Sequence, residues 1–268
     1  MPRHLQRLAP LALVCVCQFV AAQPAESRAR VRMHEGLPVV EGIYLNGRGP
    51  YRFVLDTGSA VNQLDPAIAR ELVIAPTFKS ELVSSTGRVP VLGSDRVSVA
   101  LDGVSADNQM FFFVASEALK FATIKIEGLL GQEFLSHFDY LLDLKEGRLE
   151  FGSLDHPLHD GARTHFTMVE GRPVIATSLG KMVMDSGADA VVRFRVPGGA
   201  TTRQLRTLTG MTAVGTVRST LVIEQRKFWQ GEAVAVPQPH ESGVDGLLPL
   251  GLFDKVYVNN SESYVILE

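Results

Sequence analysis

The stretches "FVLDTGSAV" at residues 53–61 and "KMVMDSGADAVV" at residues 181–192 decide the fold of this chain. In each stretch an apolar run leads into an aspartate, Asp56 or Asp185, which is followed by a hydroxyl residue and a glycine. A carboxylate in such a place is costly unless it is hydrogen-bonded or protonated. One copy is explained by a simple turn, since aspartate is a common turn residue. Two copies in one chain indicate a pair of carboxylates that act together.

The sequence around the two aspartates repeats. Residues 38–59 and 173–188 each contain two extended runs around a glycine-containing turn, and each ends in the aspartate motif. "GLLGQEF" then begins at residue 128 and "GLLPLGLF" at residue 246, and a closing hairpin follows each. Strand-length segments separated by turn signals are typical of an all-β protein. The sequence therefore predicts two halves on one plan, with one short helix within residues 65–74.

The N-terminus has the layout of a secretory signal peptide. Basic residues precede an apolar stretch, and "VAA" at residues 20–22 ends it with small residues at the expected cleavage site. An uncleaved membrane anchor is the alternative, although the stretch is short for a bilayer span. Export would place the mature chain in the periplasm or outside the cell, without stable membrane association. The predicted segments are a signal peptide (1–22), an N-terminal lobe (23–152), a linker (153–165) and a C-terminal lobe (166–268).

Composition limits the function classes. The net charge of −3 gives no reason to expect a nucleic-acid partner. Both cysteines, Cys15 and Cys17, lie inside the predicted signal peptide, so the mature chain would have no disulfide, cysteine nucleophile or cysteine metal ligand. "HPLH" at 156–159 has a spacing that suits a metal but lacks a clear third ligand. We therefore expect no metal and no organic cofactor.

The repeated motifs resemble those of a known family. "LDTGS" and "MDSGA" match the D-[TS]-G-[SA] signature of aspartic peptidases, and "GLLG" is similar to the apolar-apolar-Gly strand of that family. The chain resembles two retropepsin-like units in tandem, in a bilobed, pepsin-like arrangement. The resemblance implies an all-β fold of two pseudo-symmetric closed-barrel lobes with an active-site cleft between them. Two departures stand out: Pro249 replaces the glycine found at Gly131, and residues 84–91 lack the flap tyrosine of pepsin-like members.

The resemblance implies a catalytic dyad of Asp56 and Asp185. Two carboxylates that share one proton activate a water molecule and protonate the leaving nitrogen of a peptide bond. The resemblance also makes Thr57 and Ser186 cross-lobe hydroxyls that hold the dyad rigid. Gly58 and Gly187 would permit the tight turns and bring the backbone close to the carboxylates and the substrate.

The two aspartate loops differ in ways that predict unequal roles. Ser59 is able to donate to the carboxylate of its own half, whereas Ala188 is not, so we expect the ionised form to be favoured at Asp56. Asp189 matches a substrate-binding aspartate of retroviral members, and an ion pair with Arg193 is the alternative. The hairpins around residues 86–91 and 210–217 are the candidate flaps that exclude water when closed.

The interpretation of these features is an aspartic endopeptidase that acts on peptides or proteins. One chain supplies both aspartates, so a monomer would be active. A non-catalytic peptide- or protein-binding module with the same fold is the main alternative. A chain whose lobes pair with those of another copy is a second alternative.

Overall fold

The computed structural model describes residues 28–84, 87–115, 120, 124–152, 158, 160–207, 210–237 and 243–268. The predicted signal peptide and its cysteines, the "HPLH" histidines, part of the predicted linker and Thr86 of the first candidate flap lie outside the described residues. Within the described ranges, no helix combines the length and the apolar character needed to cross a membrane.

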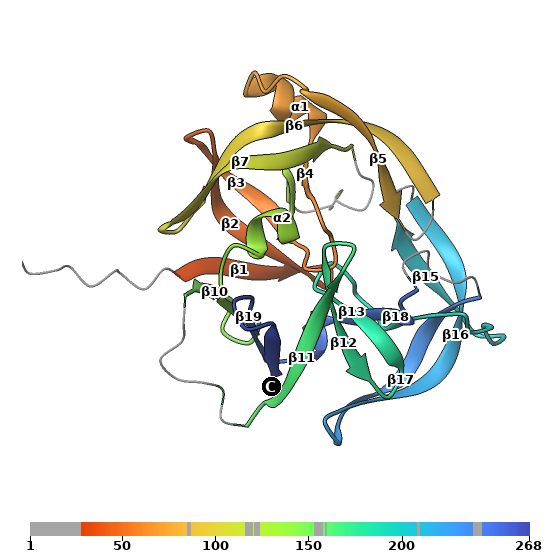
Figure 1. Ribbon diagram of the computed structural model, residues 1–268. Coiled ribbons are helices and arrows are strands. Elements are labelled where there is room, and N and C mark those ends of the chain that lie inside the picture. Colours follow the sequence, from red (N-terminus) through yellow and green to blue (C-terminus); the bar gives the residue numbers. More distant parts are fainter. Residues whose placement is uncertain are drawn as a thin grey trace, which may run out of the picture.

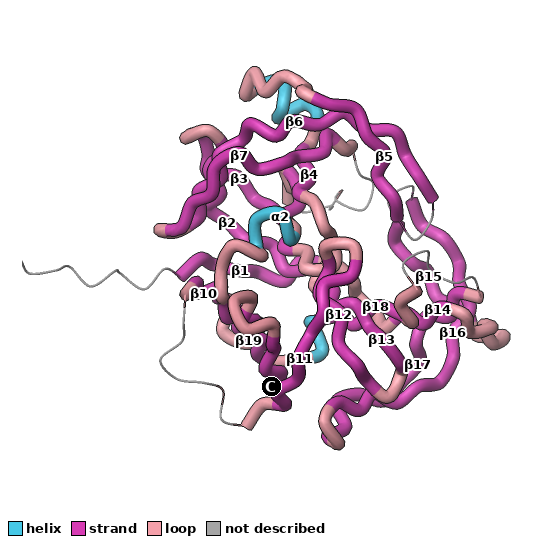
Figure 2. The backbone as a smooth tube through the Cα atoms, viewed as in Figure 1, coloured by secondary structure: helices cyan, strands magenta, loops and turns pink. Residues whose placement is uncertain are grey.

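The described residues form an almost entirely β structure, which confirms the predicted all-β class (Figure 2). The first half contains β1 (Arg28–His34), β2 (Leu37–Leu45), β3 (Arg48–Leu55), β4 (Asn62–Leu64), α1 (Pro66–Glu71), β5 (Phe78–Ser84), β6 (Gly87–Leu101), β7 (Val104–Phe113), β8 (Gly128–Leu130), α2 (Gln132–Leu135), β9 (Tyr140–Asp143) and β10 (Arg148–Phe151). Helix α1 is the short helix predicted within residues 65–74, and the Asp65 carboxylate caps its N-terminus.

The second half repeats this order in the lower part of Figure 1. It contains β11 (Ala162–Val169), β12 (Arg172–Thr177), β13 (Gly180–Asp185), β14 (Val192–Phe194), β15 (Thr202–Thr207), β16 (Gly210–Ile223), β17 (Arg226–Val236), β18 (Gly246–Pro249), the 3-10 helix η2 (Leu250–Leu252), β19 (Lys255–Asn259) and β20 (Tyr264–Leu267). As expected from the fixed φ and missing N–H of proline, β18 ends at Pro249, and η2 stands where the first half has α2.

The strand pairings of the two halves are equivalent. Strand β3 pairs in parallel with β8, and β13 pairs in parallel with β18, so each aspartate motif emerges beside a "GLL" strand. The parallel pair β4–β7 and the antiparallel pair β4–β8 have counterparts in β14–β17 and β14–β18. Phe53, Val54 and Leu55 are all buried, as expected for a strand covered on both faces, which reads as a continuous apolar run.

A sheet shared by the two halves joins them. Its strands run in the order β1–β10–β9–β19–β20–β11, with every neighbouring pair antiparallel. The central pair, β9 and β19, brings one strand from each half together, and Leu142 lies opposite Val256 with both side chains fully buried. Strands β1 and β11 continue from this sheet into the lobes, where they pair with β2 and β12. The relative position of the two lobes is therefore fixed by backbone hydrogen bonds and a common core.

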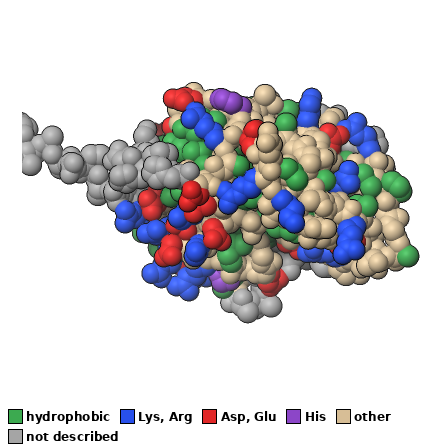
Figure 3. All heavy atoms as spheres, turned by 90° about the horizontal axis from the view of Figure 1, so that it is seen from below, with side chains coloured by type: hydrophobic (Ala, Val, Ile, Leu, Met, Phe, Trp, Pro, Cys, Tyr) green, Lys and Arg blue, Asp and Glu red, His purple; other side chains and the backbone are tan. Residues whose placement is uncertain are grey.

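Charged side chains of both signs intermingle on the face shown in Figure 3. Ion pairs on β1 and β10 include Arg28–Glu150 and Arg148–Glu150, with closest N–O distances of 3.7 and 3.6 Å. Such partly exposed pairs add little stability. Most of the stability of the fold therefore comes from the buried core.

We expect Leu142→Ala to lower the free energy of unfolding by about 2–5 kcal/mol, because it leaves a cavity in the shared sheet. Leu92→Ala is the matched control, since Leu92 also lies on a strand but is 43% exposed. The control should cost less than about 0.5 kcal/mol. Urea unfolding measures both values, and equal losses would contradict the assignment of the shared sheet as a central core.

Candidate active site

Asp56 and Asp185 lie at equivalent ends of two buried strands. Asp56 follows β3, and its backbone N–H donates to the carbonyl oxygen of Leu130 at 3.0 Å. Asp185 is the last residue of β13 and is paired in register with Pro249. The Asp56 side chain keeps some exposure, whereas Asp185 is 9% exposed. The fold therefore brings the two aspartates predicted from the sequence to one place.

Reciprocal hydrogen bonds lock the two aspartate loops together. The Thr57 hydroxyl donates to the carbonyl oxygen of Met184 at 2.8 Å and accepts from the Ser186 N–H at 3.0 Å. The Ser186 hydroxyl donates to the carbonyl oxygen of Leu55 at 2.7 Å and accepts from the Thr57 N–H at 2.9 Å. All four bonds are buried. Thr57 and Ser186 thus have the cross-lobe positions that the sequence resemblance implied.

Each motif glycine lies against the carboxylate of the other half. A Cβ atom on Gly58 would lie 2.4 Å from the Asp185 carboxyl carbon, and one on Gly187 would lie 2.5 Å from that of Asp56. The Gly58 N–H also donates to Asp56 Oδ1 at 2.9 Å, and the Gly187 N–H donates to Asp185 Oδ1 at 2.9 Å. Only glycine fits at these positions, and its N–H groups supply a matched donor to each carboxylate.

The environment of the pair favours retention of a proton. Burial raises the pKa of Asp56, and burial together with the nearby Asp56 charge raises the pKa of Asp185 well above its usual range. The carboxylates hydrogen-bond to each other, and the Gly58 and Gly187 N–H groups partly oppose the rise in pKa. Two carboxylates in such contact do not both ionise readily, so the pair titrates as one coupled unit.

Arg172 is a functional candidate that the sequence analysis missed. Its positive charge lowers the pKa of both aspartates, and its side chain is largely buried and pairs with Glu170 at 3.0 Å. It follows the β11–β12 turn, where a Cβ on Gly171 would lie 3.0 Å from the Ala60 Cβ. The β1–β2 turn is the counterpart: a Cβ on Gly36 would lie 3.3 Å from the Asp189 Cβ. The sequence did contain a signal for Arg172. "EGLPVV" at 35–40 is repeated as "EGRPVI" at 170–175, with Arg172 at the position of Leu37.

The prediction that the Ser59 hydroxyl donates to Asp56 is wrong. This hydroxyl donates to the carbonyl oxygen of Val61 at 2.8 Å. Serine readily bonds to backbone groups two residues away, and here the local carbonyl is the acceptor. The Ser59 hydroxyl is therefore not a source of asymmetry between the two carboxylates, although the Ser59 backbone N–H does lower the pKa of Asp56.

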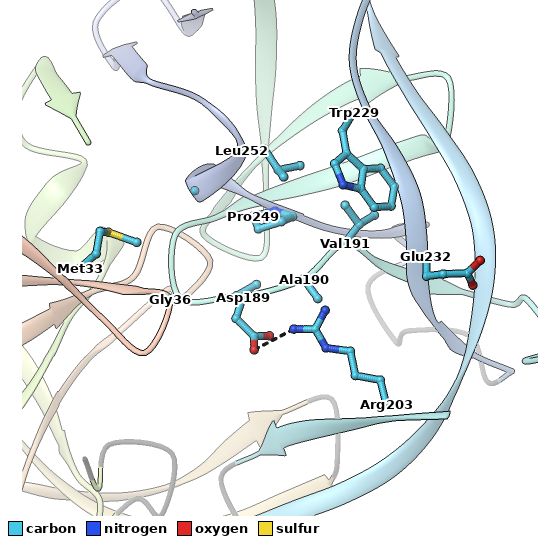
Figure 4. Close-up of a pocket in the computed structure, with 12 residues that line it drawn as sticks. Met33, Gly36, Asp189, Ala190, Val191, Arg203, Trp229, Glu232, Pro249 and Leu252 are labelled. Carbon is cyan, nitrogen blue, oxygen red and sulfur yellow. Dashed lines mark hydrogen bonds and ion pairs between the residues drawn. The ribbon is translucent and has the colours of Figure 1, made fainter. Parts of the chain in front are cut away.

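Asp189 lies in a pocket of about 240 Å³ beside the second aspartate loop (Figure 4). Its carboxylate accepts from Arg203 at 3.1 Å. The alternative prediction of an ion pair was correct in kind, but the partner is Arg203 and not Arg193. Arg203 belongs to β15, a strand of the second candidate flap hairpin. Five apolar side chains from both halves form much of the remaining wall: Met33, Val191, Trp229, Pro249 and Leu252. The pocket thus has an apolar side and a charged side.

Comparison with protein families supports the assignment of the first half. Residues 42–134 match the family model described as aspartyl protease. The matched segment includes the "DTGS" motif, the "GLLG" strand and part of α2. In this segment the chain is similar to the aspartyl protease family, and the match supports a hydrolase activity of the protease kind. A comparison with curated proteins finds no match.

We expect Thr57→Val to lower the free energy of unfolding by about 1–3 kcal/mol, because it leaves the Met184 carbonyl and the Ser186 N–H without their buried partner. Thr167→Val on the exposed face of β11 is the control. Chemical unfolding of both variants measures the difference. A loss no larger than that of the control would contradict a stabilising role for the Thr57 hydroxyl.

Proposed function

We propose that this chain is an aspartic endopeptidase in which Asp56 and Asp185 form the catalytic dyad. The observation that supports the proposal most directly is the facing arrangement of the two carboxylates, each covered by the glycine of the opposite loop. The reciprocal bonds of Thr57 and Ser186 hold this arrangement. The family match covers Asp56 and its loop. The equivalent strand pairings support extension of the same role to Asp185.

The proposed reaction uses a dyad that carries one proton. The ionised carboxylate takes a proton from a water molecule, whose oxygen attacks the carbonyl carbon of the scissile peptide bond. The protonated carboxylate gives its proton to the carbonyl oxygen. Collapse of the tetrahedral intermediate then breaks the C–N bond, and a dyad proton passes to the leaving nitrogen. The Gly58 and Gly187 N–H groups hold the carboxylates in place during these transfers.

The proposed substrate is a peptide or protein segment bound in an extended form beneath the β5–β6 and β15–β16 hairpins. The apolar side of the pocket suits a large apolar side chain near the scissile bond. Asp189 is proposed to contact substrate from the charged side, where Arg203 now orients it. We further propose that the exported, mature chain acts as a monomer in the periplasm or outside the cell.

We expect Asp56→Asn and Asp185→Asn each to lower kcat by about 10³-fold or more, with little further loss in the double variant, because the two groups act as one unit. The assay incubates the protein with a diverse peptide mixture and identifies products by mass spectrometry. Asp95→Asn, at an exposed position on β6, is the control. A single dyad variant with wild-type turnover would refute the dyad. Peptide binding without cleavage by the wild type would favour a binding module.

We expect Arg172→Gln to move the pH profile of kcat/KM toward higher pH by roughly half a unit. The Arg172 cation favours the ionised dyad and lowers both pKa values, so its removal raises them. Arg163→Gln, an exposed arginine on β11, serves as the control. A shift toward lower pH, or the same shift in the control, would contradict this electrostatic role.

A further inference from the structure

Gln132 contacts the first aspartate loop through two separate hydrogen bonds. Its side-chain Nε2 donates to the carbonyl oxygen of Thr57 at 2.9 Å, and its backbone N–H donates to the carbonyl oxygen of Ser59 at 2.9 Å. The residue begins α2 and is 3% exposed. A buried polar side chain is costly unless it is hydrogen-bonded, so the bond to Thr57 is needed to keep this amide in the core.

The carbonyl that accepts from Gln132 belongs to the peptide group that serves the dyad. The Thr57 carbonyl and the Gly58 N–H are the two ends of one planar peptide. That N–H donates to Asp56 Oδ1 at 2.9 Å. A donor at the carbonyl end polarises the peptide and strengthens the bond that its N–H donates, because chained hydrogen bonds are cooperative. The same bond fixes the plane of the peptide and therefore the direction of the N–H.

The residue of the second half that corresponds to Gln132 carries no side-chain donor. "GLLGQ" at residues 128–132 corresponds to "GLLPL" at residues 246–250, so Leu250 stands where Gln132 stands. The Leu250 side chain is fully buried and carries no hydrogen-bonding group. The Gly187 N–H still donates to Asp185 Oδ1 at 2.9 Å, but a leucine cannot donate to the carbonyl of the preceding Ser186.

We infer that Gln132 is a positioning residue that acts through the Thr57–Gly58 peptide to favour the ionised carboxylate at Asp56. This inference rests on the proposed dyad and specifies which of its members acts as the base. Gln132 is a source of asymmetry between the two halves in place of the Ser59 hydroxyl, which is directed to Val61, and it adds to the Ser59 backbone N–H, which also lowers the pKa of Asp56. The charged groups that act on Asp56 in the described residues are Asp185 and Arg172. Neither changes when Gln132 is substituted.

The test compares Gln132→Met, which keeps the side-chain length, and Gln132→Leu, which copies Leu250. Loss of the donor weakens the Gly58 bond to ionised Asp56, so the acid limb of the kcat/KM profile should move to higher pH. Cooperative strengthening by about 10–30% of one bond to a charged group corresponds to a shift of roughly 0.1–0.7 pH units. KM should change less than kcat. The substrate is one internally quenched fluorescent peptide chosen from the cleavage products of the peptide mixture.

Gln109→Met is the matched control. Gln109 is a glutamine of the same lobe that is 2% exposed, and its amide contacts the Asp107 carbonyl and His137, away from the aspartate loop. This variant should lose stability without a shift in the pH profile. If the Gln132 and Gln109 variants shift the profile equally, or if neither Gln132 variant shifts it, the inference is overturned.

A second measurement separates this inference from the proposed function. Carbon-13 NMR of aspartate-labelled protein follows the carboxyl titrations directly and requires no turnover. Both Gln132 variants should raise the lower macroscopic pKa of the dyad, whereas Gln109→Met should not. A raised value in a protein that cleaves no peptide would support the positioning role and reject the peptidase. Unchanged titrations in an active enzyme would retain the peptidase and reject the positioning role.

Discussion

The contact between two carboxylates in a buried interface is the constraint on which the rest of the structure depends. Two such groups repel each other when both are ionised, and burial raises the cost of either charge. The fold lowers this cost with backbone donors from Gly58 and Gly187, and the raised pKa values of both aspartates favour retention of a proton. The donors are effective only at fixed positions, which the Thr57 and Ser186 bonds and the shared six-stranded sheet maintain. Much of the repeated architecture thus holds the four carboxyl oxygens of Asp56 and Asp185 in position.

The repeat is broken at a small set of positions around that contact. Arg172 stands where the first half has Leu37, and Asp189 stands where the first half has Ala60. The pair Gln132 and Leu250 differs in the same way. The strand pairings remain equivalent, so these differences alter charge and hydrogen bonding without a change of framework. The site is therefore asymmetric in chemistry, although its backbone follows a two-fold plan.

Features that depend on short motifs could be predicted from the sequence. Side-chain contacts that depend on strand geometry could not. The all-β class followed from the repeated strand-length segments, α1 from the segment at residues 65–74, and the approach of Asp56 to Asp185 from the resemblance of the two motifs to those of aspartic peptidases. The partner of Asp189 could not be predicted from the sequence. Val192 and Phe194 are buried, and because side chains alternate along β14, Arg193 lies on the other face and contacts Ser219. Arg203 reaches Asp189 only because β15 folds back over the loop. The acceptor of Ser59 is likewise set by loop conformation and not by residue type.

A single chain with two aspartate loops permits an arrangement that identical subunits cannot encode. Where two identical chains supply one carboxylate each, the free enzyme has no fixed preference for which one is ionised. Here each loop has its own neighbours, and Gln132 belongs to only one of them. In the proposed peptidase, a fixed preference would remove the need to relocate the proton before each turnover and would match one orientation of the substrate to one base. The same independence lets the second half carry the Asp189–Arg203 pair while the first half has Ala60 at the position that matches Asp189.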